Sequence, residues 1–239
     1  MGYPKQAIIL CGGLGTRMRN VTRGMQQKIM LEIDGNPIVE YLIELFKSYD
    51  VKDIILSVCY HRDDVKRYFG DGSRFGVRIS YTEEDENNPL GTGGALALSR
   101  EKINGTFVLV NGDNLTDLNI REMYELHETR DALTSIALVD VDDPREYGSV
   151  RIDDSDRIVE FLEKTVMKVS PWVNSGFYIM EPGVFDFLLE GRHSLEKDVF
   201  PEIVSTGNVY GYKYSGKWID VGNKERYEKA KQLFGRPEQ

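Results

Sequence analysis

The stretch "AIILCGGLGTRMR", Ala7 to Arg19, joins a continuous apolar run to a loop that has three glycines in four positions and two arginines. An uninterrupted apolar run is typical of a strand that is buried on both faces. The loop does not fit G-x-G-x-x-G, because Met18 stands at the third glycine position, nor the P-loop, because Gly15 precedes Thr-Arg. A simple turn needs fewer glycines, so this excess indicates a backbone that lies against a phosphate-bearing ligand.

The segments around this loop alternate between strand-like and helix-like patterns. Strands are predicted over 6–10, 53–60, 77–81 and 106–113, and helices over 37–50, 62–69 and 93–101. This alternation predicts an α/β fold with a doubly wound, mostly parallel Rossmann-like sheet. After about Asp140, strands are predicted over 148–154, 157–164 and 172–180 without long helices between them. We therefore expect a small mixed or antiparallel lobe set against the main sheet, and a closing helix over 223–234.

Length and charge narrow the function classes. The 239 residues are interpreted as one domain, with a first part over about 1–140 and a second lobe with the closing helix over about 141–239. A net charge of −9 argues against a nucleic-acid partner, so any phosphate must be bound by a local cluster of donors. The two cysteines and three histidines form no disulfide framework or zinc spacing. The apolar runs are too short to cross a membrane, so we expect a cytoplasmic protein. The sequence leaves open whether the protein forms a homo-oligomer.

Several motifs together carry a family resemblance. "GGLGTRMR" (12–19), Lys28 and "DGNPIVEY" (34–41) resemble the signature of sugar-1-phosphate nucleotidyltransferases, the nucleotide-sugar pyrophosphorylases. The other motifs follow in the family's order: "PLGTGGAL" (89–96), "VNGDN" (110–114), "EYGSVRID" (146–153), "FLEK" (161–164), "VNSGFY" (173–178), "SLEKDVFP" (194–201) and "WIDVGN" (218–223). The resemblance implies transfer of a nucleotidyl group from a nucleoside triphosphate to a sugar 1-phosphate, with release of pyrophosphate. It also implies that the part over about 1–140 is the nucleotide-binding part and that the lobe over about 141–239 binds the sugar.

The resemblance also implies roles for particular residues. Those implied in catalysis are Arg17, Lys28, Asp113, Lys164 and Asp220. Those implied in nucleotide binding are Leu10, Gly12, Gly13, Gly15, Thr16, Arg17, Glu84, Gly91 and Thr92. Those implied in sugar binding are Gly148, Glu163, Lys164 and Asn174. By the same resemblance, Asp113 and Asp220 share a Mg²⁺ ion that bridges phosphate oxygens.

The residues themselves add three arguments. Asp113 ends a predicted parallel strand, at the edge where ligands of open α/β sheets bind. The attacking sugar phosphate is largely ionised, because the second pKa of a phosphate monoester is about 6, so no histidine is needed as a base. In the acidic run 83–87, Glu83 or Glu84 could accept from the two N–H groups of guanine, although a solvated loop explains the run equally well.

Substrate choice and activity leave alternatives. "PLGTGGAL" and "SLEKDVFP" look most like the guanylyltransferase branch, which uses GTP with mannose 1-phosphate or manno-heptose 1-phosphate. A glucose-1-phosphate thymidylyl- or uridylyltransferase shares the core motifs. A non-catalytic regulatory paralogue that binds a nucleotide sugar is the third alternative, since "MQQKIM" (25–30) replaces the family's Pro-Lys-Pro and predicts a more mobile or differently aimed Lys28.

Two segments are expected to lie outside the chemistry. The run "EKD" at 196–198 is predicted to be a surface or structural helix start. The sequence stops soon after the closing helix, so no C-terminal β-helix domain of the kind found in larger relatives is expected.

Overall fold

The computed structural model describes residues 2–13, 15–22, 26–141, 143–163 and 170–236. Its main sheet contains β1 (Gln6–Leu10), β4 (Asp53–Val58), β5 (Arg78–Glu83), β6 (Phe107–Asn111), β8 (Thr134–Asp140), β9 (Gly148–Ile152), β10 (Ile158–Glu163), β11 (Trp172–Met180) and β12 (Val209–Tyr214). The helices are α1 (Arg19–Thr22), α2 (Ile38–Ser48), α3 (Arg62–Phe69), α4 (Gly91–Ala97), α5 (Ile120–Thr129), α6 (Phe200–Ser205) and α7 (Lys224–Phe234). Two small sheets pair β2 (Glu32–Ile33) with β3 (Asn36–Pro37) and β7 (Asn114–Thr116) with β13 (Trp218–Asp220).

The first part of the chain forms the expected parallel sheet. Strands β6, β1, β4 and β5 are neighbours in that order, and all their pairings are parallel. Ile9 packs with the residues of α2, α3 and α5, whereas Ile8 packs with those of α4 and α6. Alternate strand residues therefore face different helical layers, which is why the predicted strands read as continuous apolar runs. This is the predicted doubly wound α/β arrangement.

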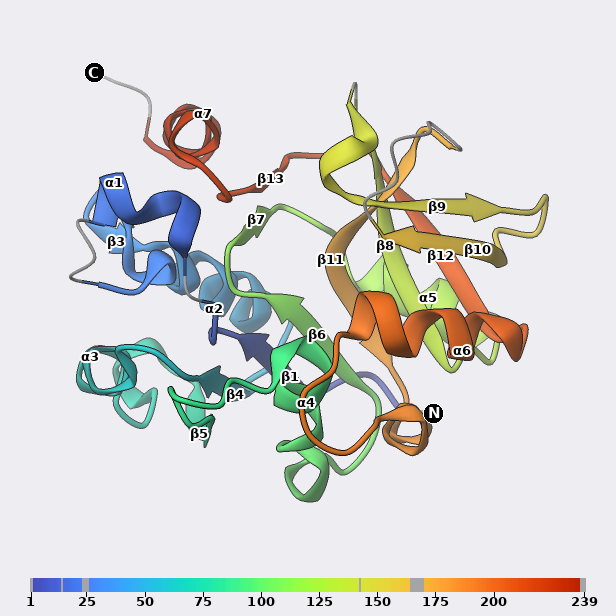
Figure 1. Cartoon of the computed structure of the whole chain (residues 1–239), viewed down its shortest axis with the longest axis horizontal. Coiled ribbons are helices and arrows are strands. Elements are labelled where there is room, and N and C mark those ends of the chain that lie inside the picture. The colour runs from blue at the N-terminus through green and yellow to red at the C-terminus, as the bar shows by residue number, and fades with distance from the viewer. Residues whose placement is uncertain (1, 14, 23–25, 142, 164–169, 237–239) are drawn as a thin grey trace.

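The second part of the chain differs from the prediction in its placement. Its strands extend the main sheet rather than forming a lobe set against it, because β11 pairs antiparallel with β6. β8 then pairs with β11 and β12 with β8, while β9 and β10 continue the sheet at the other end of β11. Figure 1 shows β6 and β11 near the centre, with β4 and β5 at lower left and β9 and β10 at upper right. Pairing β11 with β6 removes an open sheet edge, and this explains the continuity.

A third apolar cluster connects the glycine loop to the end of the chain. Met18, Leu115, Ile219 and Ala230 are buried together, so α7 and β13 pack beside the start of the fold. Because β13 pairs with β7, residues that are distant in sequence meet directly after β6. Among the helices that the structure describes, none is long and apolar enough to cross a membrane.

Candidate active site

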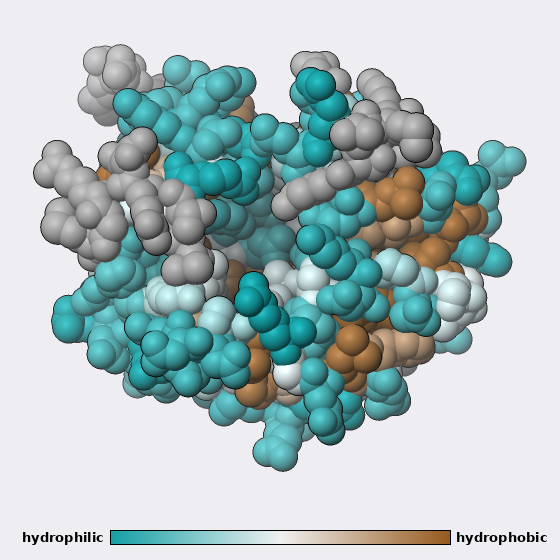
Figure 2. All heavy atoms as spheres, viewed as in Figure 1, coloured by the Kyte–Doolittle hydropathy of each residue, from teal (hydrophilic) through white to brown (hydrophobic). Residues whose placement is uncertain are grey.

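Two adjoining cavities open at the carboxyl ends of the parallel strands. The first cavity, of about 350 Å³, lies against Gly12, Glu84 and Gly91. The second cavity, of about 370 Å³, lies against Gly148, Asn174 and Asp220. Three residues line both cavities: Thr92, Asn111 and Asp113. Figure 2 shows that the upper middle of this face is hollowed and that its walls are largely hydrophilic.

The first cavity collects most of the predicted nucleotide-binding residues. Of these, Leu10, Gly12, Gly13, Glu84, Gly91 and Thr92 line it, together with Lys28 and Asp113. Arg17 is exposed and lines the second cavity instead. Gly15 has a φ of 57°, and a Cβ there would lie 3.2 Å from Cβ of Lys28. For Thr16 the structure describes the backbone, in a short 3-10 turn, but not the side chain.

Glu84 is a buried carboxylate in the wall of the first cavity. The residue is 4% exposed, and its Oε2 accepts a hydrogen bond of 2.6 Å from the backbone N–H of Leu90. Burial raises the pKa of this carboxyl, and the Leu90 hydrogen bond partly offsets the rise. A Cβ on Gly12 would lie 2.5 Å from Oε1, so a side chain at this position would displace the carboxylate. Glu83 is exposed and pairs with Lys66, which makes Glu84 the cavity residue of the two.

The glycines of "PLGTGGAL" also serve packing. Gly91 has a φ of 74°, and a Cβ there would lie 2.6 Å from the carbonyl oxygen of His193. A Cβ on Gly93 would overlap the imidazole of the same histidine. The backbone of His193 donates to Leu90 O over 2.9 Å and accepts from Gly93 N over 3.1 Å. These glycines therefore let the segment before the π-helical turn Leu195–Val199 lie flat on the cavity wall.

The lysine loop is tied to the glycine loop. Gln27 stands before Lys28, where the family has a proline, and its buried side chain donates a hydrogen bond of 2.7 Å to the carbonyl of Cys11 at the end of β1. Lys28 forms an ion pair with Asp113. A side-chain hydrogen bond thus supplies a tether where the prolines are absent. Sequence reasoning missed Gln27, because a polar residue in an irregular loop carries no pattern.

Asp113 and Asp220 approach each other through backbone pairing. In the β13–β7 ladder Asp220 lies opposite Asn114, and the N–H of Val221 donates to the carbonyl of Asp113 over 2.9 Å. Burial acts to raise the pKa of Asp113, but the Lys28 ammonium more than offsets it and holds that pKa below its ordinary value. Burial, with Asp113 as the next cause, raises the pKa of Asp220 to about 6. Both carboxylates line the second cavity, and the sharing of a Mg²⁺ ion by them stays a prediction.

The carboxylate oxygens of Asp113 and Asp220 suit a hard cation that takes its remaining ligands from water and phosphate. Oδ1 of Asp220 is buried and has no hydrogen-bond partner within the described ranges, whereas Oδ2 accepts from Arg226 over 3.1 Å. No third aspartate, glutamate, histidine or cysteine joins the pair among the residues that the structure describes. Mg²⁺ is commonly held by one or two carboxylates together with water and phosphate oxygens, so these residues fit it.

The second cavity holds the predicted sugar-side residues that the structure describes. Gly148, Glu163 and Asn174 line it, and Lys164 lies outside the described residues. A Cβ on Gly148 would lie 3.1 Å from Oε2 of Glu163. The Asn174 amide donates to the hydroxyl of Tyr178 over 2.8 Å and accepts from the N–H of Gly176 over 2.9 Å. An amide has two donors and two acceptor sites, so Asn174 keeps one of each for a ligand.

The "EKD" run has a larger role than the sequence predicts. It does begin a helical turn, as expected, but Glu196 and Lys197 also line the second cavity. Oε2 of Glu196 accepts from the hydroxyls of Thr92 over 2.8 Å and Ser194 over 2.7 Å. This contact connects the walls of the two cavities. The position of the run inside a family motif is the signal that could have found it.

Comparison with known proteins agrees with this architecture. The family model described as nucleotidyl transferase matches residues 6–235. The mannose-1-phosphate guanylyltransferase of Mycobacterium tuberculosis is 36% identical over 92% of this chain, and the match spans 62% of that protein. The UTP–glucose-1-phosphate uridylyltransferase of Synechocystis is 33% identical over 94% of this chain and 62% of that protein. The chain thus spans less than two thirds of the length of these curated relatives.

Solved structures share the whole fold. A putative glucose-1-phosphate thymidylyltransferase from Bacillus anthracis, in complex with sucrose, matches with a TM-score of 0.88 and 27% identity, over 97% of each chain. HddC from Yersinia pseudotuberculosis, complexed with GMP-PN, matches with a TM-score of 0.81 and 31% identity, over 96% of this chain and 99% of that one.

Proposed function

Since the chain belongs to the nucleotidyl transferase family, we propose that it joins a nucleoside triphosphate to a sugar 1-phosphate and releases pyrophosphate. The observation that carries this proposal is the meeting of two cavities at Asp113, Asn111 and Thr92. A reaction that joins two substrates needs two adjoining binding sites, so that the reacting atoms of the two substrates meet. Of the three shared residues Asp113 is charged, and it pairs with Lys28 of the first cavity.

The first cavity would take the nucleotide. The glycine loop gives the backbone room to lie against it, and Lys28 and the shared Asp113 also line this cavity. Arg17, at the second cavity, would face the outgoing phosphates. The long negative run of a triphosphate needs such a local cluster, because the protein as a whole carries a charge of −9.

Asp113 and Asp220 would hold Mg²⁺, which supplies charge neutralisation at the phosphate oxygens. Lys28 pairs with Asp113 in the structure, and its flexible stem lets the ammonium turn to a nearby phosphate once the nucleotide is bound. The sugar phosphate needs no base, because it is already largely a dianion near neutral pH. Catalysis by this chain would then consist of alignment and electrostatic stabilisation.

We further propose GTP and a manno-configured sugar 1-phosphate as the substrates. The buried Glu84 carboxylate matches guanine, whose N1–H and N2–H₂ are two donors on one edge, whereas uracil and thymine have one ring N–H. The 36% identity to a mannose-1-phosphate guanylyltransferase and the GMP-PN complex of a structural neighbour support this choice. The glucose-1-phosphate thymidylyl- and uridylyl-transferring relatives make dTTP or UTP with glucose 1-phosphate the alternative.

Pyrophosphate release tests the proposal directly. With Mg²⁺ present, GTP, dTTP and UTP are crossed against mannose, manno-heptose and glucose 1-phosphates. Turnover with GTP and a manno sugar supports the full proposal. Turnover with dTTP or UTP and glucose 1-phosphate would keep the reaction and overturn the base assignment. No turnover in any pair, with nucleotide still bound, would favour the regulatory paralogue.

Lys164 is tested in the same assay. The family resemblance assigns this lysine to the sugar phosphate, so Lys164→Ala should raise the KM for sugar phosphate far more than the KM for the triphosphate. An equal rise in both would show that this role is wrong.

A further inference from the structure

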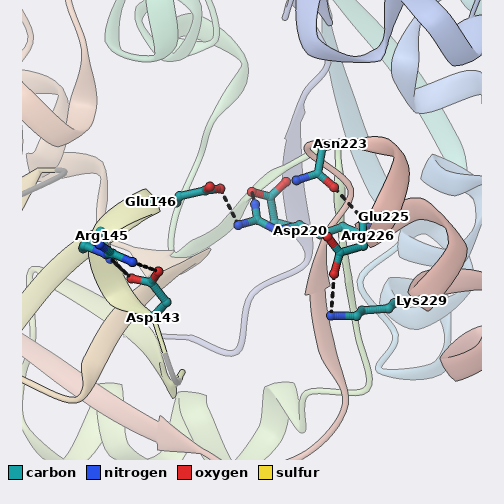
Figure 3. Close-up of polar contacts among 8 residues, drawn as sticks. All are labelled: Asp143, Arg145, Glu146, Asp220, Asn223, Glu225, Arg226 and Lys229. Carbon is teal, nitrogen blue, oxygen red and sulfur yellow. Dashed lines mark hydrogen bonds and ion pairs between the residues drawn. The ribbon is translucent and has the colours of Figure 1, made fainter.

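Arg226 makes contacts unlike those of its neighbours in Figure 3. Arg145 pairs with Asp143 and Lys229 pairs with Glu225, each within its own segment. Arg226 instead joins two distant segments: Nη1 donates to Oδ2 of Asp220 over 3.1 Å, and Nη2 donates to Oε2 of Glu146 over 2.6 Å. One guanidinium thus connects the end of β13 with the short 3-10 turn before β9.

The surroundings fix the guanidinium in this position. The Arg226 side chain is 16% exposed, and its guanidinium lies over the ring of Tyr147 at 4.8 Å from the centroid. That ring packs edge-on against Trp218, with centroids 5.3 Å apart. At Gly222 a Cβ would lie 3.0 Å from Oδ1 of Asp220 and 3.3 Å from Nη1 of Arg226, so a side chain there would crowd the pair.

Both partners of Arg226 line the second cavity. Because Arg226 occupies Oδ2 of Asp220, the orientation of the carboxylate is set and the buried Oδ1 is left without a partner within the described ranges. The same guanidinium holds Glu146 beside Tyr147 and Gly148 at the wall of this cavity. Lysine could not do the same, because its single ammonium lacks the planar fork that reaches two carboxylates at fixed angles.

We propose that Arg226 is a positioning residue that orients the Asp220 carboxylate for the metal. Through Glu146 it also fixes the position of the second cavity's wall relative to Asp220. This inference rests on the proposed function, since it assigns the second cavity to the sugar phosphate and Asp220 to the metal. Arg226 itself lines neither of the two cavities. Loss of Arg226 should therefore weaken both the binding of the metal at Asp220 and the binding of the sugar phosphate in the second cavity. It should leave the binding of the nucleotide without metal unchanged.

Binding at equilibrium separates this role from a general effect on stability. The affinity for GTP is measured by calorimetry without sugar phosphate, once with Mn²⁺ and once with EDTA, and the ratio of the two affinities gives the contribution of the metal. We expect Arg226→Gln to lower this ratio about tenfold and to leave the affinity in EDTA unchanged. In steady-state assays the same variant should raise the KM for sugar phosphate about fivefold or more, and the KM for GTP should rise no further than the loss of the metal contribution explains.

Three further variants separate the parts of the proposal. Glu146→Gln should raise the KM for sugar phosphate and keep the metal ratio. Arg226→Lys should recover most of the metal ratio, because it keeps a positive charge beside Asp220, but not the KM. Lys229→Gln is the matched control, because it removes a positive charge from the same helix at a residue that lines neither cavity. Its metal ratio and its KM for sugar phosphate should equal those of the wild type. Thermal melting of each variant reports whether it is folded.

The outcomes are distinct. An Arg226→Gln protein with the wild-type metal ratio and the wild-type KM for sugar phosphate would overturn the inference alone. A variant that loses affinity for GTP in EDTA to the same extent would also overturn it, because the effect would then be general. A wild-type protein whose affinity for GTP does not respond to Mn²⁺ would overturn the metal assignment in the proposed function, and the inference with it.

Discussion

Replacing Glu84 by glutamine changes one atom of the first cavity and gives a sharp test of base recognition. The backbone N–H of Leu90 donates to one side-chain oxygen of Glu84 over 2.6 Å, and this donor is fixed by the loop. In the Glu84→Gln variant the amide oxygen must take this hydrogen bond, since an amide NH₂ group cannot accept it. The NH₂ group then occupies the place of Oε1, beside Gly12.

The expected magnitude follows from the donors and acceptors. A hydrogen bond to a charged group contributes about 1.5–3 kcal/mol, and an NH₂ group in its place meets the N–H of guanine donor to donor. The loss corresponds to about 10- to 150-fold in kcat/KM for GTP. UTP and dTTP offer carbonyl oxygens that can accept from the NH₂ group, so their kcat/KM should be unchanged or raised.

The assay is pyrophosphate release with each triphosphate at saturating sugar phosphate. The control is Glu83→Gln, because Glu83 is exposed and pairs with Lys66 outside both cavities. The Glu84→Gln protein should be at least as stable as the wild type, since the change removes a buried group whose pKa burial raises. An unchanged ratio of GTP to UTP turnover in a folded variant would refute the reasoning.

Three further predictions follow from the packing and charges. Asp220→Asn should lower Mg²⁺-dependent turnover at least about 100-fold with a near-normal melting temperature, and residual turnover above a tenth of wild type would contradict the metal role. Gly176→Ala should destabilise the fold by at least about 2 kcal/mol in urea, because φ is 78° and a Cβ would overlap Asn114 Nδ2. Burial outweighs the opposing effect of Glu181 and lowers the pKa of His127. The contribution of the neutral, buried His127 to stability is therefore complete above pH 6.5 and is lost as the pH falls below that value, because the unfolded chain then binds a proton more readily. Urea titrations from pH 7.5 to pH 5 should show a steeper loss for wild type than for His127→Gln, and equal slopes would contradict it.

The parallel part of the fold could be predicted because its signals are local. β1, β4 and β6 are largely buried apolar runs, and the predicted helix at 62–69 matches α3 at both ends. The placement of the second part could not be predicted in the same way. It depends on β11 pairing with β6, a contact between distant strands that no local pattern specifies.

The residues of the site also fall into those that a local motif predicts and those that depend on distant contacts. Residues in motifs, such as Gly12, Glu84 and Asp113, were predicted and lie together in the first cavity. Gln27 and Arg226 were missed. Gln27 acts through one hydrogen bond to a backbone carbonyl. Arg226 lies in a helix that also carries three lysines, and the sequence does not show which of these basic residues contacts Asp220.

The position of β11 has a consequence for synthesis. This strand lies between β6 and β8, yet it is translated after both of them. Until Met180 has left the ribosome, a nascent chain therefore exposes one unpaired edge on β6 and leaves β8 without either of its partners, since β12 is translated later still. Exposed edges invite pairing with other chains. We infer that this protein completes its sheet late and is most dependent on chaperones in the interval before β11 is inserted.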